Sequence, residues 1–395
     1  MGTHYDTIVL GLGAVGSATT YQLAKRGNRV LGIDQFSPPH TLGSTHGESR
    51  ITRQAIGEGE AYVPLALRSH EIWDELERET GETLLTNTAG GLIISSGAVT
   101  VSNHVENFFE NTVAAAKRFD IGHEILTADE IRKRFPQFNV RDNEMGYFEH
   151  KAGFLRPENC VRVQLALAEK HGAELHRNER VLTFTQEGTI VHVTTDKGEY
   201  TAEKLIVCAG PWLPNLIDKK YGHLFSVIRQ VMYWFDVKES IEPFLPEHCP
   251  IYIWELQGNT QGLYGFPAID GSRGGVKMAS EQYETQTTAD SVVREVSEEE
   301  KRAMYENFVA PYFPGLSDRC LKAVACLYTN TPDSGFVIDT HPEFSSVILA
   351  SPCSGHGFKH SAAVGEALSQ VVIDGQSKIN LSAFRLNRFL GESAT

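Results

Sequence analysis

The sequence predicts an α/β protein in which a Rossmann-type domain is interleaved with a second domain built on a mixed β-sheet. Near the N-terminus a short apolar strand runs into a glycine-rich turn and then a helical stretch, which is typical of a βαβ unit. Buried strands of the parallel type recur at residues 205–209 and 347–350, whereas residues 222–324 hold strands rich in aromatic side chains. A chain of 395 residues is also longer than a single hydrophobic core usually supports, so two domains are expected.

The N-terminal βαβ unit carries the pattern of a dinucleotide-binding turn. A β-branched strand ends at Gly11, and a helix continues after Gly16. Gly11 permits the tight turn, Gly13 lets the backbone approach a pyrophosphate, and Gly16 lets the helix pack on the strand. Asp34 ends the second strand, 18 residues after Gly16, where its carboxylate can accept hydrogen bonds from a ribose diol. The pattern predicts dinucleotide binding rather than a plain βαβ turn, but it does not separate FAD from NAD.

The remaining elements follow from hydrophobic periodicity and turn residues. Helices are predicted at residues 62–80, 107–118, 128–134, 160–171, 298–309 and 354–370. Strands are predicted at residues 174–176, 231–235, 251–254, 262–266, 336–338 and 347–350, with a hairpin or meander at 181–204 and a buried strand at 205–209. No internal repeat or low-complexity linker separates them, so the domains are expected to interleave. The predicted nucleotide-binding domain comprises residues 1–90, 151–221 and 325–395, and the predicted substrate domain comprises residues 91–150 and 222–324.

The composition excludes several classes of partner. With 36 basic and 50 acidic residues the formal net charge is -14, so long-range electrostatics repel nucleic acids and anionic membrane surfaces. No apolar run is long enough to cross a bilayer, and the N-terminus lacks the pattern of a signal peptide. The six cysteines have no CxxC spacing, which favours reduced thiols in a cytoplasmic protein over disulfides or a metal site. A small anionic substrate would need a local cluster of Arg and Lys.

Four segments together resemble one family of flavoenzymes. They are the glycine turn at 11–16, the loop at 46–53 with 57–65 after it, the run at 325–333, and residues 354–359. In this order, and at this chain length, they resemble the monomeric sarcosine oxidase and N-methyltryptophan oxidase family of FAD-dependent amine oxidases. The resemblance implies FAD as the cofactor.

The resemblance also implies a covalent thioether bond between FAD and Cys326. A thiolate is the competent nucleophile toward the flavin methyl carbon. On composition alone Cys326 would be a small buried hydrophobe, and the other five cysteines keep that interpretation. Further residues are expected to contact FAD beside the glycine turn and Asp34: Ala14, Val15, Ser44, Val181, Gly210, Trp212, Gly355, His356, Gly357 and Lys359.

A cationic grip for the substrate carboxylate is a further implication. Arg53 and Lys359 stand where the family holds this group, and a guanidinium that contacts both carboxylate oxygens suits the role. For Arg53 the alternative is a structural ion pair with Glu48 or Glu58. For Lys359 the alternative is a solvated residue of a helix.

Other residues match positions beside the flavin ring in that family. His46 and Arg50 would place positive charge there, which favours the anionic reduced flavin. Lys277 matches the lysine that activates dioxygen over the opposite face of the ring, where an ammonium stabilises the charge on reduced oxygen. The plain alternatives are a histidine in a polar loop and a lysine on the surface of a strand. Tyr264 and Tyr328 match active-site tyrosines, and the alternative for both is ordinary core packing.

The predicted substrate pocket departs from the family pattern in two places. The stretch before Lys277 is slightly longer, and Glu281 stands four residues past this lysine, where the sarcosine enzymes have a histidine. A carboxylate there would hold a cationic amine differently and could favour another substrate. Ile253 and Trp254 are expected either to wall the pocket or to belong to an ordinary core.

The expected reaction is oxidation of the C–N bond of a small secondary amino acid, such as sarcosine or another N-methyl amino acid. Hydride passes to the flavin, the imine product hydrolyses, and dioxygen becomes hydrogen peroxide. Related alternatives are a cyclic imino acid such as pipecolate or proline and a primary amino acid, oxidised by an oxidase or a dehydrogenase. An NAD-dependent dehydrogenase and a non-catalytic FAD-binding module are alternatives of other classes. A monomer is expected, and the sequence leaves the physiological substrate and the electron acceptor open.

Overall fold

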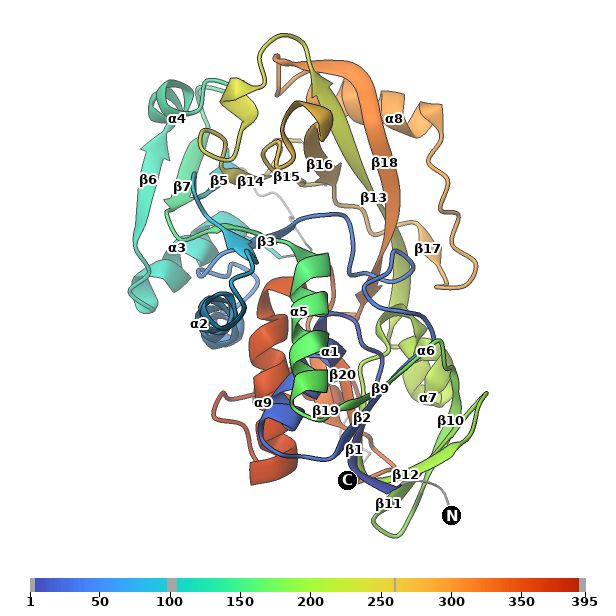
Figure 1. The fold of residues 1–395 in the computed structure, drawn as a ribbon. Helices are drawn as coiled ribbons and strands as arrows, with labels where there is room; N and C mark the ends of the chain where they lie inside the picture. Colours follow the sequence, from blue (N-terminus) through green and yellow to red (C-terminus); the bar gives the residue numbers. More distant parts are fainter. Residues whose placement is uncertain (1–3, 98–104, 259–260, 391–395) are drawn as a thin grey trace.

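The computed structural model describes residues 4–97, 105–258 and 261–390. Residues 1–3 and 391–395, at the outer ends of the predicted nucleotide-binding segments, lie outside the described residues. Two large β-sheets form the lower and upper halves of the molecule in Figure 1. A small sheet of β3 (Arg50–Thr52), β8 (Gly153–Leu155) and β4 (Leu85–Thr86) completes the described sheets. The predicted combination of a Rossmann-type sheet and a mixed sheet is confirmed.

The lower sheet has the parallel core of a Rossmann-type domain. β1 (His4–Leu10) pairs in parallel with both β2 (Val30–Asp34) and β12 (Glu199–Val207). β20 (Val347–Ser351) pairs in parallel with β12, so the last part of the chain returns beside the first. β2 and β20 are buried at every residue, as expected for parallel strands covered on both faces. The other described strands of this eight-stranded sheet are β9 (Glu174–Arg177), β10 (Val181–Glu187), β11 (Ile190–Thr195) and β19 (Val337–Thr340).

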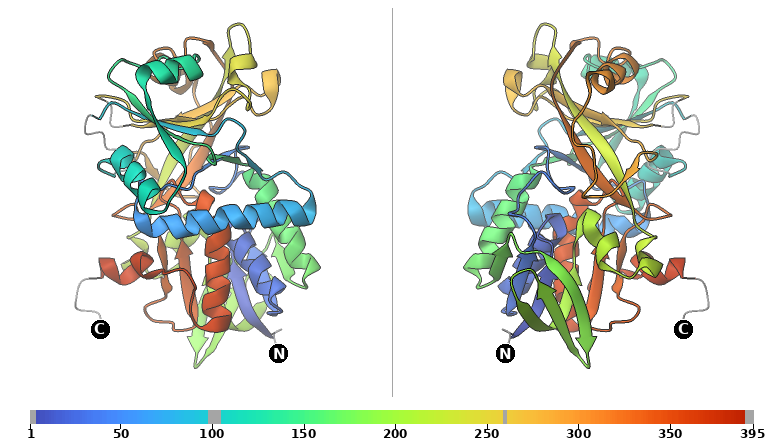
Figure 2. Two further views of the ribbon diagram at one scale, coloured as in Figure 1. Left: turned by 90° about the vertical axis from the view of Figure 1, so that its left-hand side faces the viewer. Right: turned by 90° about the vertical axis from the view of Figure 1, so that its right-hand side faces the viewer.

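Three helices pack together against this sheet. They are α1 (Ala14–Lys25), α5 (Pro157–Lys170) and α9 (Ser361–Asp374), and Figure 1 shows them side by side. Gly365 lets α9 approach α1 closely, because an added Cβ would lie 2.5 Å from the Cβ of Ala18. α2 (Val63–Thr80) crosses α9 between the two halves of the molecule, as Figure 2 shows. These contacts support the start of α1, where the glycine turn lies.

The upper sheet is mixed and is joined to the lower half by one long strand pair. β13 (Ser226–Val237) and β18 (Leu316–Asn330) are antiparallel and descend toward the lower half in Figure 1. Cys326 and Tyr328 lie near the C-terminal end of β18. The other described strands of this nine-stranded sheet are β5 (Gly91–Ser95), β6 (His123–Thr127), β7 (Met145–Glu149), β14 (Ile251–Trp254), β15 (Leu263–Gly265), β16 (Val276–Ser280) and β17 (Gln286–Thr287). The helices α3 (Phe108–Arg118), α4 (Ala128–Arg134), α6 (Leu213–Leu216), α7 (Lys219–Gly222) and α8 (Glu298–Met304) complete the fold.

Three predicted elements differ from the structure. β12 is one strand, where a hairpin ending at 204 and a new strand at 205 were predicted, because its polar first part and buried last part hide a continuous backbone. The helix predicted at 354–370 begins at Ser361, since Ser354 and Gly355 have φ angles of 44° and 81° that no α-helix accommodates. The helix predicted at 298–309 is an α-helix only to Met304 and continues as a π-helix over Tyr305–Val309.

The strand pairing does not by itself divide the chain into domains. Strands of the lower sheet come from residues 4–34, 174–207 and 337–351, and strands of the upper sheet come from residues 91–149 and 226–330. β18 crosses residue 325, where one predicted boundary falls, so the predicted division stays a prediction. Among the described residues, no helix is both long enough and apolar enough to cross a membrane.

Candidate active site

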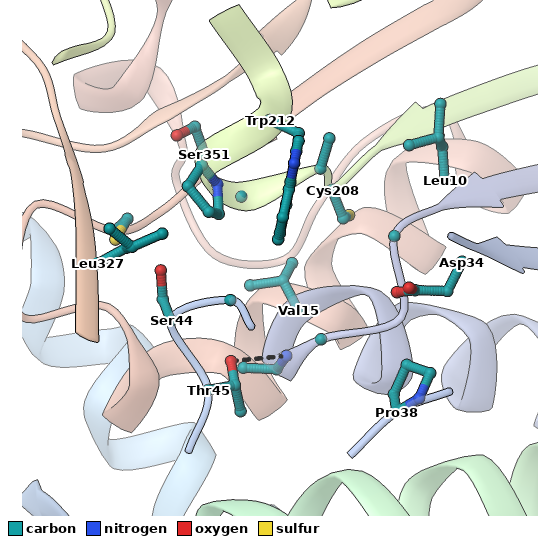
Figure 3. Close-up of a pocket in the computed structure, with 18 of the residues that line it drawn as sticks. Leu10, Val15, Asp34, Pro38, Ser44, Thr45, Cys208, Trp212, Leu327 and Ser351 are labelled. Carbon is teal, nitrogen blue, oxygen red and sulfur yellow. Dashed lines mark hydrogen bonds between the residues drawn. The ribbon is translucent and has the colours of Figure 1, made fainter. Parts of the chain in front are cut away.

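A cavity of about 260 Å³ lies at the carboxyl ends of the parallel strands of the lower sheet. Open α/β sheets bind their ligands at this edge. Figure 3 shows the residues that end or directly follow these strands around the cavity: Leu10, Asp34, Cys208 and Ser351. The loop that carries Ser44 and Thr45 forms another wall.

The glycine turn has the geometry that its sequence predicts. Gly11 has a φ angle of 87°, and an added Cβ would lie 2.4 Å from the carbonyl oxygen of Cys208. Gly16 is a packing residue rather than a lining residue, because an added Cβ would lie 1.7 Å from the carbonyl oxygen of Gly11. An added Cβ at Gly13 would meet Oγ1 of Thr45 at 3.6 Å, and this hydroxyl accepts the N–H of Ala14 at 3.4 Å. The start of α1, with Ala14 and Val15 in the cavity wall, is where a phosphate would meet the helix N–H groups.

Most residues predicted to contact a dinucleotide line this cavity: Gly11, Gly13, Ala14, Val15, Asp34, Ser44, Val181, Gly210, Trp212, Gly355 and Gly357. The Asp34 carboxylate accepts hydrogen bonds from the backbone N–H groups of Leu12 and Phe36, both at 2.8 Å, which hold it at the cavity edge. The sequence analysis missed Thr45 and Arg180, which also line the cavity. Their only signal in the sequence is that each is adjacent to a predicted residue.

A second cavity of about 70 Å³ adjoins the first, because Arg50, Tyr328, Gly355 and Phe358 line both. Predicted site residues form much of its wall: Arg53, Ile253, Tyr264, Glu281, Cys326, His356 and Lys359. The predicted cofactor contacts Cys326, His356 and Lys359 thus line the smaller cavity and not the larger one. Lining residues that the sequence analysis did not assign to the site are Ile51, Glu58, Met232 and Phe266.

Trp254 does not wall this pocket. Ile253 and Trp254 are neighbours on β14, so their side chains point to opposite faces of the sheet. Ile253 lines the smaller cavity, whereas Trp254 packs in the core of the upper sheet and donates its indole N–H to Glu144 at 2.9 Å. The predicted pocket role is therefore wrong for Trp254.

Arg53 and Lys359 meet around Glu58 in the smaller cavity. Nη2 of Arg53 lies 2.5 Å from Oε2 of Glu58, and Nζ of Lys359 lies 3.8 Å from Oε1. Burial acts to raise the pKa of Glu58, but Arg53, with Lys359 and His356, outweighs it and holds this pKa well below its ordinary value. Arg53 is therefore both a lining residue and half of an ion pair. Its contact with a substrate carboxylate stays a prediction. Glu48 pairs instead with Lys322.

Lys359 is not a solvated residue. It is 5% exposed, and its Nζ donates to the carbonyl oxygen of His356 at 2.7 Å. Burial lowers the pKa of Lys359 to about 8, against the opposing effect of Glu58. The predicted alternative of a solvated helix residue is wrong, because Lys359 lies in the short 3-10 turn Phe358–His360 that leads into α9 from the cavity wall.

Arg50 stands beside Cys326 where the two cavities meet. Its Nη2 lies 3.5 Å from Sγ of Cys326 and donates to the carbonyl oxygen of Ser44 at 2.9 Å. The hydroxyl groups of Tyr264 and Tyr328 lie 3.3 Å apart in the smaller cavity. Burial raises the pKa of Tyr264 to about 12, so this hydroxyl keeps its proton.

His46 does not share the positive charge that was expected beside the flavin. It is buried, and burial, with the charges of Arg50 and Lys277, lowers its pKa to about 3. The imidazole is therefore neutral near pH 7, and the positive charge belongs to Arg50. Among the described residues, Nε2 of His46 has no hydrogen-bond partner.

Lys277 lies inside the protein, so the alternative of a surface lysine is wrong. It is 1% exposed, and its Nζ donates to the carbonyl oxygens of Gly47 at 2.7 Å and Ser49 at 2.8 Å. Burial, assisted by the charge of Arg50, lowers the pKa of Lys277 well below its ordinary value. Lys277 lines neither cavity and instead supports the loop that leads into Arg50.

Replacing Lys277 by Met should lower the free energy of unfolding by about 2–4 kcal/mol, because the carbonyls of Gly47 and Ser49 lose a buried hydrogen-bond donor. Denaturant titration of the FAD-loaded protein measures this change. Lys322→Met is the matched control. Both lysines approach the Trp234 ring, Lys277 at 5.4 Å and Lys322 at 4.7 Å, but the side chain of Lys322 is 44% exposed. A loss no larger than in the control would contradict the supporting role of Lys277.

The chain matches a family described as FAD dependent oxidoreductase over residues 6–371. It belongs to this family of FAD-dependent oxidoreductases. The match decides between FAD and NAD, which the glycine pattern alone left open. The site fits FAD, because the start of α1 at Gly13 and Ala14 lines the larger cavity, and Nε2 of His46, which has no partner among the described residues, lies buried in the loop next to it.

Full-length relatives of this FAD-dependent oxidoreductase carry the names of oxidases that act on N-methyl amino acids. It is 41% identical over 395 residues to the monomeric sarcosine oxidase of Streptomyces avermitilis, and the alignment covers all of both chains. It is 35% identical over 386 residues to the N-methyl-L-tryptophan oxidase of Yersinia pestis, covering 98% of this chain and 99% of the relative.

Solved structures share its fold at low sequence identity. NikD, an amino acid oxidase of nikkomycin biosynthesis, has a TM-score of 0.82 and 21% identity over 97% of both chains. The L-proline dehydrogenase from P. horikoshii has a TM-score of 0.81 and 21% identity over 99% of both chains. At these identities the likeness shows the fold alone.

Proposed function

We propose that this FAD-dependent oxidoreductase oxidises the C–N bond of a small secondary amino acid, such as sarcosine or another N-methyl amino acid. One observation carries the proposal. Arg53 and Lys359, two buried cations, line the same small cavity as Cys326 and Arg50, next to the nucleotide-binding edge of the lower sheet. The names of the full-length relatives, sarcosine oxidase and N-methyl-L-tryptophan oxidase, support this substrate class.

In this proposal the substrate carboxylate binds between Arg53 and Lys359 and competes with Glu58 for the guanidinium. Charge-assisted hydrogen bonds to a planar guanidinium fix both the position and the orientation of a carboxylate. We call Arg53 and Lys359 the carboxylate clamp. Ile253 lines the same cavity and offers an apolar surface to the rest of a small amino acid. The clamp thus orients the reacting C–N bond, which is the main contribution a protein makes to such a reaction.

FAD, when bound, would supply the chemistry by accepting a hydride, which carries both electrons. The glycine turn and Asp34 would hold its dinucleotide part, and Cys326 would bind the ring covalently. Arg50 supplies positive charge at the junction of the two cavities, where negative charge on the ring would be stabilised. The imine product hydrolyses, which for an N-methyl amino acid yields the free amino acid and formaldehyde.

We also propose dioxygen as the electron acceptor, with Lys277 as the cationic group that stabilises charge on reduced oxygen. Its ammonium would remain bound to the loop carbonyls of Gly47 and Ser49 in this role. A monomeric state and a cytoplasmic location stay predictions from the sequence.

An anaerobic screen of flavin absorbance tests the proposed function. N-methyl, cyclic and primary amino acids are mixed in turn with the FAD-loaded protein, and air is then readmitted. We expect rapid bleaching with a small N-methyl amino acid and return of the colour with formation of hydrogen peroxide. Faster bleaching with pipecolate, proline or a primary amino acid would show that the substrate belongs to that class and not to the small N-methyl amino acids. Absence of bleaching with every amine would sink the proposal.

A further inference from the structure

Glu281 directly follows β16 and lines the smaller cavity. Its backbone N–H donates to the carbonyl oxygen of Gly262 at 2.9 Å, which ties it to the segment before β15. The next residue, Gln282, exchanges hydrogen bonds with Gln230 of β13: its N–H donates to Oε1 at 3.4 Å, and its carbonyl accepts from Nε2. The backbone of Glu281 is therefore held by two neighbouring strands, which fixes the starting point of the side chain.

The charged and titratable groups that interact electrostatically with Glu281 come from several elements. They are Arg53 and Glu58 after β3, Lys359 before α9, Tyr264 on β15, Tyr328 on β18, and Tyr283 in the same segment. Burial, with the negative charge of Glu58, raises the pKa of Glu281 to about 8, against the opposing effects of Lys359 and Arg53. Arg53 and Glu58 already form an ion pair at 2.5 Å. Glu281 is therefore a second carboxylate in a cavity whose cations, Arg53 and Lys359, suit an anionic group.

We infer that Glu281 binds the ammonium group of the substrate and accepts its proton. The inference rests on the function proposed above. An amino acid whose carboxylate is held by Arg53 and Lys359 carries its ammonium group only two bonds from that carboxylate carbon. In a cavity of about 70 Å³ the second carboxylate is then the group of complementary charge within reach.

The proton transfer prepares the nitrogen for oxidation. A protonated amine has no lone pair, so it cannot form a C=N bond. The proton moves from nitrogen to a carboxylate oxygen of Glu281, which frees the nitrogen lone pair to form the C=N bond. FAD, when bound, would take up the hydride from the adjacent carbon. Glu281 returns the proton to water when the product leaves. A carboxylate whose pKa lies near the pH of the medium is suited both to accept the proton and to release it.

The dependence of ligand binding on pH separates Glu281 from Lys359. As pH rises through about 8, Lys359 loses its positive charge, which weakens binding of any carboxylate. Glu281 gains a negative charge over the same range, which strengthens binding of an ammonium group. Tyr264 keeps its proton, because burial raises its pKa to about 12. Two ligands that share a carboxylate but differ in the ammonium group lose affinity equally as Lys359 loses its charge. The ratio of their association constants therefore reports the charge of Glu281.

Betaine and 3,3-dimethylbutanoate are such a pair, because carbon replaces the quaternary nitrogen without a change of shape. Each is titrated against the FAD-loaded protein between pH 7 and pH 9, with flavin absorbance as the signal. We expect the ratio of the betaine to the dimethylbutanoate association constant to rise about tenfold over this range, as Glu281 ionises. In Glu281→Gln this ratio should not change with pH. Glu284→Gln, which neutralises an exposed carboxylate of the same segment, should behave as the wild type.

Reduction kinetics give a second measurement. Glu281→Gln should slow anaerobic flavin reduction by the best amino acid substrate about 10²-fold at pH 9 and remove the rise of this rate with pH. If Glu281→Gln does not load FAD, Glu281→Asp should still show the rising ligand ratio, because it keeps the charge.

A ligand ratio that is constant in the wild type, or that still rises in Glu281→Gln, would overturn the inference. So would a flat ratio in Glu281→Asp. These results differ from failure of the proposed function, in which the wild type binds neither ligand and no amino acid reduces its flavin.

Discussion

Replacing Cys326 by Ser is expected to abolish covalent attachment of the flavin completely. The sulfur lies in the wall of the smaller cavity, 3.5 Å from Nη2 of Arg50. A serine hydroxyl in the same place stays protonated and is a far weaker nucleophile. After acid precipitation the flavin of the variant should remain in the supernatant, whereas the wild-type precipitate should be yellow. The intact-chain mass should fall by one FAD.

Cys353→Ser is the matched control for this experiment. Cys353 lines the larger cavity, and its Sγ accepts the backbone N–H of Thr329 at 3.3 Å. Its replacement should leave the flavin bonded to the chain. If the flavin stays attached in Cys326→Ser and is lost in Cys353→Ser, the attachment site is Cys353. If neither variant nor the wild type holds flavin covalently, the thioether proposal is wrong.

Replacing Arg53 by Met is expected to lower kcat/KM for the best amino acid substrate about 10²–10³-fold, since a buried charged partner of the carboxylate is lost. Most of the change should appear in KM, because the carboxylate is bound equally in the ground state and the transition state. An N-methyl alkylamine without a carboxylate should react at a similar, low rate with both proteins. Steady-state kinetics with the two substrates separate loss of the clamp from general damage.

Two further variants control for the ion pair that Arg53 makes with Glu58. Arg53→Lys keeps the charge but loses the planar fork, so it should retain part of the affinity. The double variant Arg53→Met with Glu58→Gln removes the carboxylate that the single change leaves without its guanidinium, and it should unfold at a higher denaturant concentration than Arg53→Met. Equal losses of kcat/KM for the amino acid and the alkylamine would contradict a carboxylate clamp.

The N-terminal unit shows how far local pattern reaches. Gly11, Gly13, Gly16 and Asp34 lie where the spacing predicts, because a turn, a helix start and a strand end depend on residues adjacent in the chain. Trp254 shows the limit of that reasoning. When both faces of a strand are buried, its apolar residues give no sign in the sequence of which face they lie on. Only the strand pairing decides which face meets the pocket.

The lysines show the same limit for charged groups. Composition alone favours an exposed position for Lys277 and Lys359, yet both are buried. Their positions in the family motifs pointed to the site, but their hydrogen-bond partners could not be predicted. Nζ of Lys277 meets the carbonyl of Gly47, which is 230 positions away in the chain.

Local sequence pattern was enough to predict the βαβ unit and many of the helices and strands, and the family resemblance made Cys326, Lys359 and Glu281 candidates for the site. Folding decided that Glu58 rather than Glu48 pairs with Arg53, that His46 is neutral, and that Trp254 faces the core. The physical reason is one of range. Turn and helix preferences act over a few neighbouring residues, whereas burial and electrostatics depend on groups that only folding brings within a few ångströms.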